Sequence, residues 1–70
     1  LINALRLKLE GEVAVARANI EVYMTSSVGI GEHPDLVSAI ESQFDVIANA
    51  RDKLDAIDEF VRLRHPRQVP

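Results

Sequence analysis

The stretch Ser26-Ser27-Val28-Gly29-Ile30-Gly31-Glu32-His33-Pro34-Asp35 is the strongest interruption in a chain that otherwise carries helical periodicity throughout. A glycine at position 29 favours the left-handed conformation that ends a helix, and a proline suits the first position of the next helix. The sequence therefore predicts a helix over about 2–27, a turn over 28–33, a second helix over about 34–63 and a basic tail over 64–70. The residues that define the turn are Gly29, Ile30, Gly31, His33 and Pro34.

Two apolar stripes predict how the helices pack. The first consists of Ile2, Leu5, Leu9, Val13, Ala16, Ile20 and Tyr23, and the second of Leu36, Ile40, Phe44, Ile47, Leu54 and Val61. A turn this short allows only an antiparallel hairpin. That register pairs Ile20 with Phe44, Ala16 with Ile47, Val13 with Arg51, Leu9 with Leu54 and Ile2 with Val61. The predicted fold class is all-α, an antiparallel two-helix hairpin.

Each helix also carries an outer apolar strip that a lone hairpin would leave in water. The predicted interface residues are Leu7, Gly11, Val15, Ala18 and Val22 on the first helix and Val46, Ile57 and Phe60 on the second, where Ala39 and Ala50 complete the strip. Exposed patches of this kind mark interfaces. We predict that the chain associates with itself as a four-helix bundle or docks on a larger protein. The alternative is that its alanines only raise helix propensity.

Length and composition support association. A chain of 70 residues has room for one domain, and a core of this size rarely supplies more than about 3–5 kcal/mol. No cysteine is present, which excludes disulfides and thiolate zinc sites. Oligomerisation is the remaining source of stability.

Two polar residues interrupt the stripe of the second helix. In the predicted register Arg6 meets Asp58 and Glu12 meets Arg51. Such pairs can fix the register of two helices at a cost in stability. The alternative is that these long side chains reach the edge of the core.

The candidate chemical motifs are weak. Gly29 to Gly31 resembles part of a phosphate-binding loop but lacks its lysine and its preceding strand. Glu32, His33 and Asp35 are neighbours in one loop, a poor arrangement for a metal site. Ser26 has no histidine placed to activate it. We therefore predict no catalytic, cofactor-binding or metal-binding residues and no enzymatic activity.

Charge indicates one alternative function. The net charge is −3, yet Arg62, Arg64 and Arg67 make the tail basic. These arginines could bind phosphates of a nucleic acid, as in a small regulator similar in outline to the ROP hairpin dimer, or simply favour the negative end of the helix dipole. No apolar run reaches the roughly 20 residues of a membrane span, so we expect a cytoplasmic protein. Leu1 is not an initiator methionine, so we expect that the natural chain begins earlier.

Ala18-Asn19-Ile20-Glu21-Val22-Tyr23 and the string Val28-Gly29-Ile30-Gly31-Glu32-His33-Pro34-Asp35 resemble segments of small helical proteins of tailed, T4-like marine bacteriophages. The resemblance covers about the middle third to half of the chain. The family form has Asn-Pro before the valine, where this chain has Ser26-Ser27. The resemblance implies a phage accessory or virion-associated structural protein, and it implies no activity or functional residues.

Overall fold

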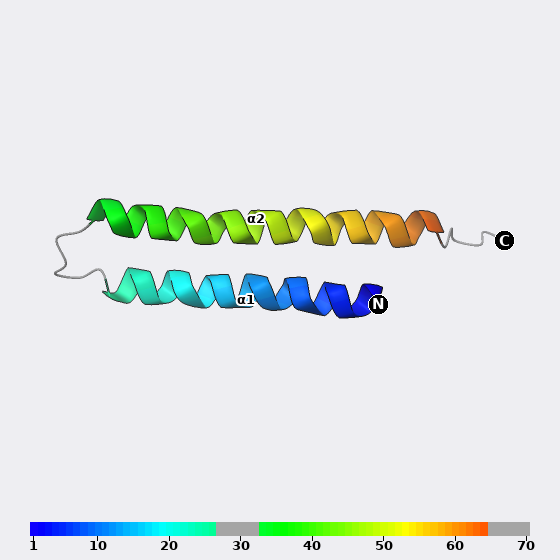
Figure 1. The fold of residues 1–70 in the computed structure, drawn as a ribbon, viewed down its shortest axis with the longest axis horizontal. Helices are drawn as coiled ribbons and strands as arrows, with labels where there is room; N and C mark the ends of the chain where they lie inside the picture. The colour runs from blue at the N-terminus through cyan, green and yellow to red at the C-terminus, as the bar shows by residue number, and fades with distance from the viewer. Residues whose placement is uncertain (27–32, 65–70) are drawn as a thin grey trace.

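The computed structural model describes residues 1–26 and 33–64, which form two antiparallel helices packed side by side (Figure 1). α1 spans Ile2–Ser26 and α2 spans His33–Arg64. Within these residues there is no strand, and the predicted all-α hairpin is confirmed. The predicted turn residues Gly29, Ile30 and Gly31 and the tail beyond position 64 lie outside the described residues.

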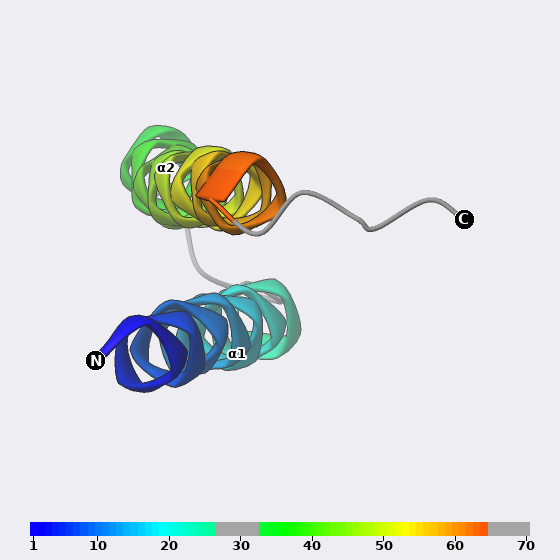
Figure 2. The ribbon, with the colours of Figure 1, turned by 90° about the vertical axis from the view of Figure 1, so that its right-hand side faces the viewer.

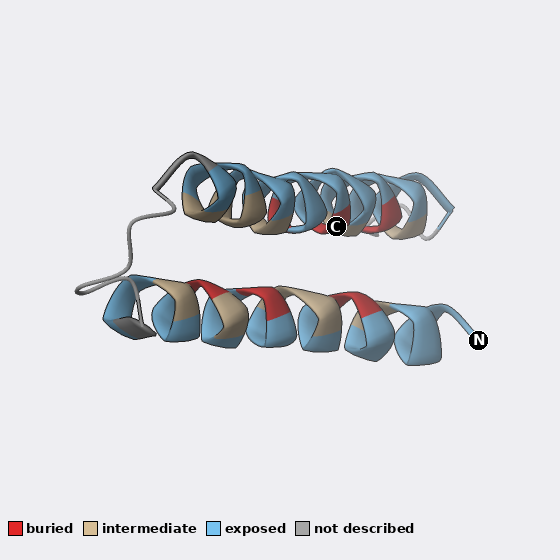
Figure 3. Cartoon of the chain, turned by 60° about the vertical axis from the view of Figure 1, so that its left-hand side comes forward, coloured by how far each residue is buried: buried red, intermediate tan, exposed pale blue. Residues whose placement is uncertain are grey.

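The core is a single seam between the two helices. Buried residues lie on the facing sides of α1 and α2, whereas the outward sides are exposed (Figure 3). The buried side chains are Leu9, Ala16 and Ile20 of α1 and Ile47, Ala50 and Ile57 of α2. They form two clusters, and Val13 packs against both, so the seam is continuous along the hairpin.

The seam follows a seven-residue repeat, with spacings that alternate between three and four. On α2 the repeat runs through Leu36, Ile40, Gln43, Ile47, Ala50, Leu54, Ile57 and Val61, and on α1 through Ile2, Arg6, Leu9, Val13, Ala16, Ile20 and Tyr23. This pattern keeps one stripe of each helix facing its neighbour, as in a coiled coil. Figure 2, which looks along the hairpin, shows the two helices as adjacent rods with inclined axes.

The seam of α2 differs in part from the predicted stripe. Phe44 was expected in the core but is 55% exposed, whereas Ala50 and Ile57 were expected on the outer strip but are 1% and 8% exposed. Those three predictions are wrong, and so is the placement of Leu5 in the stripe of α1, because Leu5 is 42% exposed. The seven-residue repeat assigns positions 43, 50 and 57 to the core, and Phe44 then lies one position to the side of it.

Polar contacts across the seam show the register of α1 against α2. Arg6 pairs with Asp58, which confirms the predicted contact between them. Towards the other end, Asn19 Nδ2 donates a hydrogen bond to Gln43 Oε1 at 3.0 Å. The predicted pair of Glu12 with Arg51 is wrong, because Glu12 pairs with Lys8 within its own helix.

Candidate protein-interaction surface

The outward side of α1, opposite the seam, is apolar along the whole helix. We call it the back face of α1 and define it as Leu1, Ala4, Leu7, Gly11, Ala14, Val15, Ala18 and Val22, all of them exposed. Leu7, Val15 and Val22 are 60%, 62% and 57% exposed. The structure therefore places all five interface residues predicted on α1 at the surface, on one face.

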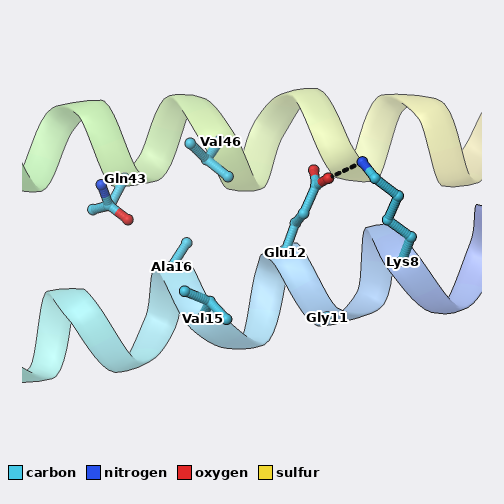
Figure 4. Close-up of a pocket in the computed structure, with 7 residues that line it drawn as sticks. All are labelled: Lys8, Gly11, Glu12, Val15, Ala16, Gln43 and Val46. Atoms are coloured by element: carbon cyan, nitrogen blue, oxygen red, sulfur yellow. Dashed lines mark hydrogen bonds and ion pairs between the residues drawn. The ribbon is translucent and has the colours of Figure 1, made fainter.

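Beside this face an apolar groove runs between the helices. It has a volume of about 530 Å³ and is lined by Lys8, Gly11, Glu12, Val15, Ala16, Gln43 and Val46 (Figure 4). A Cβ atom added at Gly11 would meet no atom of α2 within 4 Å. A helix packed here could therefore approach the α1 backbone closely at this position.

A second groove lies on the other side of the seam and has charged walls. Its volume is about 360 Å³, and Arg17, Glu21 and Arg51 line it together with Phe44. Glu12 lines the first groove and Arg51 the second, which is the geometric reason why these two side chains do not meet. The two sides of the hairpin thus differ, and the side carrying Val15 and Val46 is the more apolar one.

On α2 the predicted interface residues separate. Val46 and Phe60 are 38% and 49% exposed, whereas Ile57 packs in the seam and cannot contact a partner without unfolding the hairpin. Five acidic side chains are exposed on the outward side of α2, namely Glu41, Asp45, Asp52, Asp55 and Glu59, and Val37 and Leu63 are exposed there too. The back of α2 therefore mixes charged and apolar residues, unlike the back face of α1.

An ion pair stands at one end of the apolar groove. Lys8 Nζ lies 2.5 Å from Glu12 Oε2, one helical turn away along the same side of α1. The hydrogen bond from Lys8 lowers the pKa of Glu12 below its ordinary value of 4.5, and the charges of Lys8 and Lys53 act in the same direction. Burial acts in the opposite direction and raises the pKa of Glu12.

This ion pair predicts a small loss of stability in acid. Because the pKa of Glu12 is lower in the folded chain, the stabilisation is present above the ordinary pKa of 4.5 and is lost as the pH falls through the folded value. We expect Glu12→Gln to destabilise the hairpin more at pH 7 than at pH 3, by urea unfolding. Glu10→Gln, at an exposed position in the same helix, is the control. An equal effect of Glu12→Gln at both pH values would contradict this assignment.

The basic end of α2 is only partly described. Arg62 and Arg64 are exposed in the last turn, and the Arg64 guanidinium lies over the Phe60 ring, 5.7 Å from its centroid. Arg67 lies outside the described residues. Nucleic-acid binding by the tail stays a prediction. His33 and Pro34 begin α2, one residue earlier than predicted.

Sequence reasoning missed the Asn19–Gln43 contact. Gln43 occupies a core position of the seven-residue repeat, and its amide is satisfied by Asn19 beside the apolar groove. Position 43 is polar, so a search for hydrophobic stripes passes over it. The strict alternation of three and four from Leu36 to Val61 is the signal that would have found it.

Comparisons with known proteins do not identify a family. No protein-family model, curated protein or solved structure matches this chain. Among residues 1–26 and 33–64, no three histidine, cysteine or acidic side chains are grouped to hold a metal ion. Neither described helix is long and apolar enough to cross a membrane. The candidate functional feature is the back face of α1 with its adjoining groove, because of its exposed apolar residues.

Proposed function

We propose that this chain is a non-enzymatic structural or assembly module that acts by associating with copies of itself or with a larger protein. The observation that carries the proposal is the exposed apolar back face of α1, which the hairpin itself leaves uncovered. Monomeric soluble proteins rarely expose a continuous apolar face of this length. Virion association, which the bacteriophage resemblance implies, belongs to the same proposal because structural components of particles assemble through such faces.

The burial pattern favours association over a solitary fold. In the described chain the core consists of six side chains in one row, three of them on each helix. Exposed large hydrophobic side chains are twice as numerous as these six: Leu1, Ile2, Leu5, Leu7, Val15, Val22, Met24, Val37, Phe44, Val46, Phe60 and Leu63. Since a partner that binds only the folded chain stabilises it, covering these side chains would add the burial that the hairpin lacks.

A charge on the back face tests the proposal. We expect the unmodified chain to sediment as an oligomer, and Val15→Asp to raise its dissociation constant at least tenfold because association would bury an unpaired carboxylate. Val37→Asp is the matched control, since Val37 lies on α2 and is 64% exposed against 62% for Val15. A monomer at every concentration, with no larger protein bound, would rule out the proposed function.

A further inference from the structure

The two helices have opposite kinds of outward surface. The eight residues of the back face of α1 are all apolar, with Lys8 beside them, whereas the back of α2 carries five exposed acidic side chains. An assembly that leaves α1 in water leaves Leu7, Val15 and Val22 exposed, whereas the carboxylates of α2 stay hydrated when α2 faces water. The surface to be covered is therefore that of α1, and the covering element must itself be apolar.

The back face of α1 repeats a pattern of small and large residues every seven positions. Ala4, Gly11 and Ala18 are the small members, and Leu1, Val15 and Val22 are large ones. Lys8, beside the back face, takes the remaining large position, and Leu7 and Ala14 lie to one side of this row. The spacing between consecutive members alternates between three and four, as in the seam on the other side of the same helix. A helix that packs here needs large side chains where α1 is small and small side chains where α1 is large.

A second copy of α1 meets this requirement. When two α1 helices lie antiparallel about a two-fold axis near Val13, Gly11 faces the partner's Val15, and Ala4 faces the partner's Val22. The same register places Ala18 opposite the aliphatic stem of the partner's Lys8, which can cover it. Each of these three contacts then joins one small and one large residue. Resting on the proposed function, we propose that this chain forms a two-fold dimer through antiparallel packing of its two α1 back faces.

Area and charge are consistent with this dimer. A stable interface buries about 800 Å² per partner, and the chain exposes 5679 Å² in all. The back face runs about 37 Å along the 25-residue helix at 1.5 Å per residue, so a second α1 can contact it over its whole length. In this register the two Glu12 carboxylates lie on the same edge of the interface between the two α1 helices. Lys8 of each chain, 2.5 Å from its own Glu12, offsets their mutual repulsion.

Cysteine crosslinking tests the register, because the natural chain has no cysteine. Ala14 and Ala4 are both exposed alanines of the back face. In the proposed dimer Ala14 lies beside the partner's Ala14, whereas the two Ala4 residues are about 27 Å apart along the helices at 1.5 Å per residue. With a short bis-maleimide crosslinker, we expect Ala14→Cys to give a covalent dimer and Ala4→Cys to remain uncrosslinked. Sedimentation of each variant checks whether the dimer is retained.

The possible results distinguish a failure of the proposed packing from a failure of the proposed function. Selective crosslinking of Ala14→Cys in a species that sediments as a dimer supports the proposed packing. Crosslinking of both variants indicates parallel helices and overturns it, as does a retained oligomer in which neither variant crosslinks. In these last two results the proposed function stands and only the register fails. A chain that is monomeric with no larger protein bound overturns both.

Discussion

Replacing Leu9 by alanine is expected to unfold the hairpin at room temperature. Leu9 is 2% exposed and is the largest fully buried side chain of the described residues, packed with Ala50 and Ile57. Leu→Ala substitutions in cores cost about 2–5 kcal/mol because they remove buried area and leave a cavity. A core of this size supplies about 3–5 kcal/mol in total, so the loss approaches the whole stability of the fold.

Circular dichroism during urea unfolding measures this effect. Leu63→Ala makes the same chemical change at a side chain that is 67% exposed, and it is expected to leave the midpoint almost unchanged. The chain concentration must be equal in all samples, because association adds to the apparent stability. Equal midpoints for Leu9→Ala and Leu63→Ala would show that the seam does not pass through Leu9.

The hairpin could be predicted from the sequence because one strong break separates two long periodic segments. Gly29 and Pro34 mark the break, and with so short a turn the antiparallel direction follows from geometry. The register was also predictable, since the pairing of Leu9 with Leu54 and of Arg6 with Asp58 follows from matching two stripes about one turn. Leu9 and Leu54 belong to one core cluster, and Arg6 contacts Asp58.

The rotation of α2 about its own axis was not fully predictable. On hydrophobicity alone, Phe44 is a better core residue than Gln43. By the same measure Ala50 is a weaker core residue than the larger apolar residues of α2. The structure selects Gln43 and Ala50, because the seven-residue repeat must be kept along the whole seam. Asn19 removes the penalty of a polar residue there by donating a hydrogen bond to it. A propensity scale applied to α2 alone contains no information about that partner.

The back face of α1 was predictable for a related reason. Its residues Leu7, Val15 and Val22 lie opposite the seam, and the helical period alone separates them from the core. The outer strip of α2 was harder to define, because Ile57 lies close to the boundary between strip and seam. A period of 3.6 residues and a repeat of 3.5 diverge by about 20° per heptad. Over the 32 residues of α2 this drift suffices to move a side chain from one face to the next.

A second large effect is expected when Ala50 is replaced by aspartate. Ala50 is 1% exposed and contacts the cluster of Leu9 and Ile57. A carboxylate at this position would be desolvated without a partner, and an uncompensated buried charge costs about 3–5 kcal/mol. Ala48→Asp, two residues away at an exposed position, introduces the same group into water and is the matched control. We expect Ala50→Asp to lose the cooperative urea transition at pH 7 while Ala48→Asp retains it.

Acid should partly restore the Ala50→Asp variant, and this separates a buried charge from a general defect. Burial raises the pKa of a carboxyl group, so the introduced group is protonated in the folded chain at a pH where it is still ionised in the unfolded chain. The penalty therefore shrinks as the pH falls towards the ordinary aspartate pKa of about 3.9. Ala50→Asp should therefore regain a cooperative urea transition at pH 4, with a midpoint closer to that of Ala48→Asp. A difference independent of pH would show that the introduced carboxyl group reaches water, and that Ala50 lies at the edge of the seam rather than inside it.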